Sequence, residues 1–154
     1  MGFGLAVVIL IADQITKTAF LKLSLLEGMS IPLFGPFQLT MVWNQGISFS
    51  LLSAQTDLAR WALTLFALVV AGFLGWMLRK ADRLLLAIGL GLVMGGAIGN
   101  AIDRIRFGAV VDFFDATHLM FPWIFNLADS AISVGVAFLL LDSLLHKPGP
   151  TEAS

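Results

Sequence analysis

The sequence alternates between long apolar runs and short polar interruptions. Four of the runs are long enough to cross a membrane as helices, because a helical span needs about 20 predominantly apolar residues. They cover approximately residues 2–23, 61–78, 84–102 and 124–145. The polar stretch 148–154 after the last run has the composition of a disordered tail. The pattern therefore predicts an all-α membrane protein with four transmembrane helices, forming a single membrane domain over residues 1–154.

The segment between the first two predicted spans has a different pattern. The piece Phe37–Trp43 is rich in strand-forming residues and partly alternates between apolar and polar positions. We predict a small extra-membrane β element, about residues 31–52, lying at the membrane surface. It is either a surface loop with Trp43 at headgroup level or a platform that touches a substrate. The residues that interrupt the segment and favour turns are Pro32, Gly35, Pro36 and Gly46.

Basic residues predict the orientation of the chain. The turn 79–83 holds three of them, Arg79, Lys80 and Arg83, and His146 and Lys147 follow the last span. By the positive-inside rule the turn 79–83 and the end of the fourth span both face the cytoplasm. Both termini are then cytoplasmic and the β element is periplasmic. The N-terminus lacks the basic region and cleavage site of a signal peptide, so we expect the first run to be a retained span.

Composition agrees with a membrane location and excludes several chemistries. Of 154 residues, 58% are hydrophobic and 12% are charged, far more apolar than a soluble domain. The net charge of −1 gives no argument for a nucleic-acid partner. The chain has no cysteine, which excludes disulfides, thiol catalysis and thiolate metal sites. Two histidines, His118 and His146, without an HExxH motif argue against a zinc peptidase. We expect neither a metal nor a cofactor.

Two charged residues lie inside the first span. A charge near the centre of a membrane helix costs roughly 2.5–3.5 kcal/mol on insertion scales. Asp13 and Lys17 are four positions apart, so they share a helix face and can pair. Either the pair lies near the end of the span, where Lys17 reaches out toward water, or it helps to position a site.

The third span carries glycines at four-residue spacing, Gly91, Gly95 and Gly99. Glycines spaced in this way let another helix approach closely. We therefore predict that the third helix is central in the bundle.

Polar side chains gather around the end of the third span and the start of the fourth. Asn100, Asp103 and Arg104 share one helix face, and on their own they are typical of a structural anchor between helices. Asp112 lies among β-branched and aromatic residues, which would desolvate it. Asn126 and Asp129 are three positions apart, the spacing of a helix N-cap and a first-turn acid.

Asp112 and Asp129 flank two spans that a short loop brings together, which suggests a carboxylate pair. Two carboxylates held close together share one proton, because both cannot ionise cheaply. The ionised member can take a proton from water while the protonated member polarises a peptide carbonyl. The spacing leaves three alternatives open: an aspartyl hydrolase, a proton-coupled carrier that uses these aspartates with Asp13 and Lys17, and a structural membrane subunit.

Five motifs in the same order along the chain resemble a known family, the bacterial lipoprotein signal peptidases (type II signal peptidases). The motifs are Asp13-Gln14-Ile15-Thr16-Lys17, Asn44-Gln45-Gly46-Ile47-Ser48-Phe49, Gly95-Gly96-Ala97-Ile98-Gly99-Asn100-Ala101-Ile102-Asp103-Arg104, Val110-Val111-Asp112-Phe113 and Phe125-Asn126-Leu127-Ala128-Asp129. The similarity extends from the first span through the fourth.

This resemblance implies an aspartyl endopeptidase of the bacterial inner membrane, with its active site toward the periplasm. The implied substrate is a prolipoprotein with diacylglycerol on a cysteine, and cleavage falls just before that cysteine. The resemblance also implies a β-cradle outside the membrane, contact with membrane lipid and inhibition by globomycin-type antibiotics. Carried over by motif, Asp112 and Asp129 are the catalytic pair. Residues implied to bind substrate or support the site are Asn100, Asp103, Arg104, Asn126, Asp13, Lys17, Asn44 and Gly46.

Overall fold

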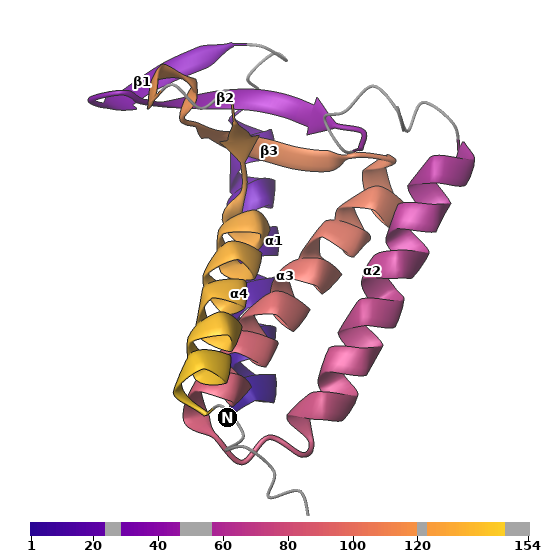
Figure 1. Ribbon diagram of the computed structural model, residues 1–154. Helices are drawn as coiled ribbons and strands as arrows, with labels where there is room; N and C mark the ends of the chain where they lie inside the picture. The colour runs from indigo at the N-terminus through magenta and orange to yellow at the C-terminus, as the bar shows by residue number, and fades with distance from the viewer. Residues whose placement is uncertain (24–28, 47–56, 120–122, 147–154) are drawn as a thin grey trace, which may run out of the picture.

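The computed structural model describes residues 1–23, 29–46, 57–119 and 123–146. Within these ranges it contains four long helices and a small antiparallel sheet (Figure 1). The helices are α1 (Gly2–Lys22), α2 (Asp57–Leu78), α3 (Leu84–Phe107) and α4 (Leu127–Leu145). Each is long and apolar enough to cross a membrane. The predicted fold class, four membrane helices with a small sheet, is confirmed.

The helices differ from the apolar runs mainly at their ends. α2 begins at Asp57, an acid in its first turn that pairs with Arg60 at 3.2 Å. α3 continues past the apolar run to Phe107 and ends where Gly108 adopts a left-handed conformation, φ 78°. Glycine takes this conformation without a steric cost, which makes it a common residue after a helix. α4 begins only at Leu127, because Ile124 and Phe125 form a strand and Asn126 is the N-cap of the helix.

The sheet is larger than the sequence pattern predicted. Its strands are β1 (Ser30–Phe34), β2 (Phe37–Asn44), β3 (Val110–Asp115) and β4 (Ile124–Phe125), in the order β1-β2-β3-β4 and antiparallel throughout. The hairpin β1–β2 is the predicted element between the first two helices. β3 and β4 come from the connection between α3 and α4 and were not predicted as strands. Residues 47–52 of the predicted β element lie outside the described residues.

The sheet lies across one end of the helix bundle (Figure 1). The N-terminus, the α2–α3 turn and the end of α4 lie at the opposite end. Side chains of the sheet form their own apolar cluster with the end of α1, consisting of Phe20, Met41, Val111 and Phe113. The rings of Phe20 and Phe113 stack with centroids 4.7 Å apart. This contact fixes β3, and therefore Asp112, over the bundle.

α3 is the central helix of the bundle. In its most apolar 18-residue window 61% of the residues are buried, against 22% in each of the other three helices. A Cβ atom added at Gly91 would lie 2.5 Å from the carbonyl oxygen of Gly2, and one at Gly95 would lie 2.6 Å from that of Ala6. At Gly99 it would lie 2.6 Å from the Asp13 carboxylate. The prediction that these glycines allow close helix packing is confirmed, and the neighbour is α1.

Gly95→Ala should destabilise the protein by about 1–3 kcal/mol, the usual cost of overpacking a tight interior. The added methyl group meets the backbone of α1, which can move only if the two helices separate. The matched control is Gly72→Ala in α2, where a Cβ atom would meet nothing within 4 Å. The control should be neutral or slightly stabilising, because alanine favours helix more than glycine does. Thermal unfolding in detergent measures both variants, and equal midpoints would contradict the packing argument.

Candidate active site

The polar side chains meet where the sheet covers the end of the bundle. Asp112 is on β3, Asn44 is at the end of β2, and Asn126 and Asp129 are at the start of α4. Asn100 comes from the part of α3 nearest the sheet. Four segments far apart in sequence therefore contribute to one cluster, and Lys17 of α1 donates to its member Asn100.

Asp112 is almost completely buried, with 2% of its surface exposed. Its neighbours on β3, Val111 and Phe113, point into the apolar cluster, so the alternation of a strand directs Asp112 to the other face. Its Oδ2 accepts a hydrogen bond from Asn44 Nδ2 at 2.9 Å, and its Oδ1 accepts one from Asn126 Nδ2 at 2.7 Å. Both carboxylate oxygens are thus held by side-chain amides.

Asn44 is held in place by its own turn. The backbone N–H of Gly46 donates to Asn44 Oδ1 at 3.1 Å, a local side-chain to backbone bond that asparagine commonly makes. This bond leaves the amide nitrogen free to face Asp112. The β2–β3 register, in which Val42 pairs with Asp112 and Asn44 with Val110, brings the two side chains together.

Asp129 completes a capping box with Asn126. Asn126 Oδ1 accepts from the Asp129 backbone N–H at 3.0 Å, and Asp129 Oδ2 accepts from the Asn126 backbone N–H at 3.1 Å. The helix-cap prediction is confirmed. The cap uses only one carboxylate oxygen, because Asp129 Oδ1 accepts from Asn100 Nδ2 at 2.8 Å. Asp129 therefore has a capping role and also a place in the cluster.

Asn126 links the two aspartates. Its side chain is fully buried, and its Nδ2 donates both to Asp112 and to Asn100 Oδ1, the latter at 3.2 Å. Asp112 and Asp129 are therefore each bonded to Asn126, one through its side-chain nitrogen and the other through its cap. The sequence pattern identified Asn126 as a cap but did not show this bridging position.

Lys17 forms a second, wholly buried cluster behind the first. Its Nζ lies 2.9 Å from Asp13 Oδ2, 2.8 Å from Asp103 Oδ2 and 2.9 Å from Asn100 Oδ1. The Asp13–Lys17 pair was predicted, but the alternative in which Lys17 reaches toward water is wrong, since only 2% of it is exposed. Its two carboxylate partners and Asn100 supply enough negative and acceptor groups to hold the ammonium inside.

The same two carboxylates bind backbone groups of the site. Asp13 Oδ1 accepts from the Ala128 N–H at 3.0 Å, next to Asp129. Asp103 Oδ2 accepts from the Val111 N–H at 3.2 Å, next to Asp112. The Lys17 cluster thus fixes the backbone beside each aspartate of the candidate pair.

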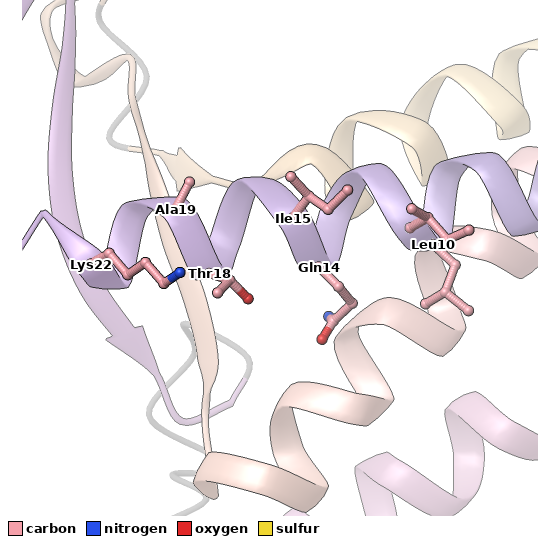
Figure 2. A pocket seen from close by; sticks show the side chains of 7 residues that line it. Leu10, Gln14, Ile15, Thr18, Ala19 and Lys22 are labelled. Atoms are coloured by element: carbon pink, nitrogen blue, oxygen red, sulfur yellow. The ribbon is translucent and has the colours of Figure 1, made fainter.

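Gln14 lies within the first motif but is not among the predicted site residues. Its Nε2 donates to Asp103 Oδ1 at 3.0 Å and to Asp13 Oδ2 at 3.2 Å, and its Oε1 accepts from Arg106 at 3.3 Å. Its position in an apolar run one residue from Asp13 was the available signal. Gln14 lines a groove along α1 that has a volume of about 570 Å³ and is otherwise mostly apolar. Figure 2 shows Gln14 with its neighbours in this groove. Neither Asp112 nor Asp129 lines this groove.

Arg104 adds positive charge beside the candidate pair. Asp129, Asp112 and Asp103 all act on it electrostatically, and its guanidinium donates to the Asn100 carbonyl at 3.4 Å. Its Nε is buried without a hydrogen-bond partner among the described residues. Arg104 therefore has one buried donor that no described residue uses.

The environment of Asp112 makes its carboxyl a weak acid. Burial raises the pKa of Asp112 to about 6, and the negative charge of Asp129 adds to this effect. The hydrogen bonds from Asn44 and Asn126 oppose it by stabilising the ionised form. Within the part of the chain that the structure describes, no group of three or more histidine and acidic side chains is arranged to hold a metal ion.

The chain is similar in sequence to proteins of one known family. The family model described as signal peptidase (SPase) II matches residues 5–145. The chain belongs to the signal peptidase II family. Among curated proteins of that kind, the lipoprotein signal peptidase of Caulobacter vibrioides is 54% identical over 150 residues, which cover 96% of this chain and 88% of the relative. The lipoprotein signal peptidase of a Methylobacterium species (strain 4-46) is 42% identical, covering 94% and 88%.

A solved structure shares this fold. A bacterial membrane enzyme solved by the in meso method at 2.3 Å resolution matches with a TM-score of 0.83 and 26% identity. The match covers 99% of this chain and 93% of the other. The four-helix bundle with its sheet is thus shared with an experimentally determined enzyme. The carrier alternative has no support from any of these matches.

Proposed function

We propose that this chain is an aspartic endopeptidase that uses Asp112 and Asp129 to cleave bacterial prolipoproteins. Membership of the signal peptidase II family supports removal of signal peptides, and the names of its relatives support prolipoprotein substrates. The finer substrate is a prolipoprotein with diacylglycerol on a cysteine, cleaved just before that cysteine. The observation that carries the aspartic mechanism is the link through Asn126, whose side-chain amide donates to Asp112 Oδ1 and whose backbone N–H donates to Asp129 Oδ2.

The two aspartates have different surroundings, which suggests different roles. Asp129 lies in the first turn of α4, where its carboxylate accepts from the Asn126 backbone N–H and from Asn100 Nδ2. We assign it to the general base that takes a proton from the attacking water. Asp112, with its raised pKa of about 6, is the acid that polarises the carbonyl and protonates the departing amine.

The remaining predicted residues support this pair or position substrate. Asn44, oriented by Gly46, and Asn126 fix the Asp112 carboxylate. Asn100 holds Asp129, and Arg104 offers a donor to the incoming carbonyl or to the developing oxyanion. The cluster that fixes the backbone beside each aspartate consists of Lys17, Asp13 and Asp103.

Incubation with two proproteins tests the proposed function. Purified enzyme in lipid nanodiscs receives the same proprotein with and without diacylglycerol on its cysteine. We expect cleavage only of the lipidated form, and a globomycin-type cyclic peptide should block it. Equal cleavage of both forms would overturn the lipid requirement, and cleavage of neither would overturn the activity.

Cleavage should decline on both sides of a pH optimum. As the pH rises above about 6, Asp112 loses the proton that it must donate. The reaction also needs one ionised carboxylate as the base, so the rate falls again in acid. The measurement is kcat/KM across acidic and neutral pH, with unfolding followed in parallel. A flat profile, with the chemical step limiting the rate, would contradict the assignment.

Asn44→Ala gives a second test of the role of Asp112. The side-chain amide of Asn44 is the main group that lowers the pKa of Asp112. Removing it should move the alkaline limb of the profile to higher pH. An unchanged limb would mean that a group other than Asp112 controls it.

We also propose that the sheet-bearing end faces the periplasm across the bacterial inner membrane. The three basic residues of the α2–α3 turn lie at the opposite end, which the positive-inside rule places in the cytoplasm. Since the chain has no cysteine, single cysteines report sidedness cleanly. Leu119→Cys near the sheet should react with an impermeant maleimide on intact spheroplasts, whereas Lys80→Cys in the turn should not. The reverse pattern would invert the orientation.

A further inference from the structure

Two apolar pockets meet beside Asp129. One, the helix arm, has a volume of about 440 Å³ and runs along α4 from Trp123 and Phe125 past Asp129 to Val134. The other, the sheet arm, has a volume of about 260 Å³ and lies between the sheet and the first turn of α4. Phe125 and Ser130 line both. The two arms therefore diverge from one point, which lies one residue from Asp129.

The walls of both arms suit hydrocarbon. The sheet arm is lined by Leu33, Phe34, Phe37 and Phe114, with Ser130 as its polar member. The rings of Phe114 and Phe125 stack at 5.9 Å, which gives this arm a flat aromatic wall. The polar lining of the helix arm is Asp129, Ser130 and Ser133, the rest is apolar, and Val134 is 49% exposed. On a membrane helix such exposure is toward lipid, so a chain in the helix arm can continue into the bilayer.

We propose that the two arms receive the two acyl chains of the substrate's diacylglyceryl group, one chain in each, with the glyceryl unit at Phe125 and Ser130. The inference rests on the proposed function and assigns its lipid specificity. If cleavage falls just before the lipidated cysteine, the glyceryl unit lies only a few bonds from the carbonyl that the aspartates attack. A ligand with two chains then needs two apolar cavities that diverge beside Asp129.

A hydrogen bond fixes the residue that lines both arms. Ser130 donates from its hydroxyl to the Asn126 carbonyl at 3.1 Å, so the same residue that links the aspartates also fixes the wall between the arms. A chain seated in either arm would place its glyceryl end at a fixed distance from the pair. Lipid binding would in this way position the scissile bond as well as supply affinity.

Val134→Trp tests the helix arm by filling it. The substrates are two lipopeptides of one sequence whose cysteine carries diacylglyceryl with long or with butyryl chains. Each buried methylene contributes about fourfold in binding, equivalent to about 0.8 kcal/mol. We expect the wild type to prefer the long-chain substrate, and Val134→Trp to lower the long-to-short ratio of kcat/KM at least tenfold. The matched control is Val136→Trp, a lipid-facing position of α4 that is 43% exposed and lines neither arm; it should keep the wild-type ratio.

Leu33→Trp tests the sheet arm in the same way, with Ile31→Trp on the same strand as its control. Combining Leu33→Trp with Val134→Trp should remove the remaining preference for long chains. Three outcomes have separate meanings. If the variants that fill the arms keep the wild-type ratio, the acyl chains lie elsewhere and the inference is wrong. If both substrates lose rate equally, the arms hold the signal peptide and the inference is again wrong. If the wild-type enzyme cleaves neither lipopeptide, the proposed function itself fails.

Discussion

Asp112→Asn and Asp129→Asn are each expected to lower cleavage of a lipidated proprotein by about 10³-fold or more. General acid–base catalysis by one positioned group contributes roughly 10²–10⁴-fold, and an amide can neither give nor take the proton. The fold should survive both changes. Asparagine at position 129 can still accept from the Asn126 backbone N–H, and asparagine at position 112 keeps an acceptor for one of its two amide donors. Cleavage is followed by the mass change of the proprotein and folding by thermal unfolding.

Asp115→Asn is the matched control for this pair. Asp115 is on the same strand as Asp112 and also buried, but it accepts from Thr40 at 2.6 Å and from the Thr117 N–H at 2.9 Å, away from the aspartate pair. Its variant should lose some stability and retain the activity of the folded protein. Near-normal processing by Asp112→Asn or Asp129→Asn would exclude the proposed pair. Complete loss in Asp115→Asn without unfolding would show that the test does not discriminate between buried aspartates.

The four helices were predictable because a membrane leaves the backbone few options. An apolar run of span length must form its hydrogen bonds internally, so it forms a helix. The helix ends were less predictable, since they depend on contacts with other parts of the chain. α3 extends past the apolar run and includes Asp103, whose carboxylate pairs with Lys17 of α1. That partner is remote in sequence.

The strands β3 and β4 were missed for a related reason. A strand with one face on the core alternates between apolar and polar residues, but five of the six residues of Val110–Asp115 are buried. No period of two is visible in such a strand. β4 has only two residues, Ile124 and Phe125, and exists because β3 pairs with it. Neither feature is local, so neither could be found from the pattern alone.

In the site, too, contacts between residues close in sequence were predictable, whereas contacts between distant residues were not. The cap formed by Asn126 and Asp129 depends on residues three apart, and their spacing predicted it. The contact between Asn44 and Asp112 depends on the β2–β3 register, which places together residues far apart in the chain. Family resemblance named the aspartate pair, but the bridging position of Asn126 emerged only from the structure.

The Lys17 cluster should matter more to stability than any other polar group in the bundle. One ammonium lies between two carboxylates that are 0% exposed, those of Asp13 and Asp103. Removing one partner of a buried ion pair typically costs about 3–5 kcal/mol, because the remaining charge stays buried without compensation. The cluster therefore predicts a sharp asymmetry between losing the cation and losing one of the anions.

Lys17→Met is expected to destabilise the protein by about 3–5 kcal/mol, measured by thermal or denaturant unfolding in detergent. Asp13→Asn is the matched control, since it leaves Lys17 paired with Asp103 and should cost far less. The triple variant Lys17→Met, Asp13→Asn, Asp103→Asn should recover most of the lost stability, because it contains no unpaired charge. This recovery is an interaction energy that separate losses of packing would not produce. If the triple variant were less stable than Lys17→Met, the two carboxylates would be stabilising the protein through their hydrogen bonds to Ala128 and Val111, and unpaired charge would not explain the loss. Recovery of stability without recovery of cleavage would in turn show that Asp13 and Asp103 position the backbone at Ala128 and Val111, beside the two aspartates.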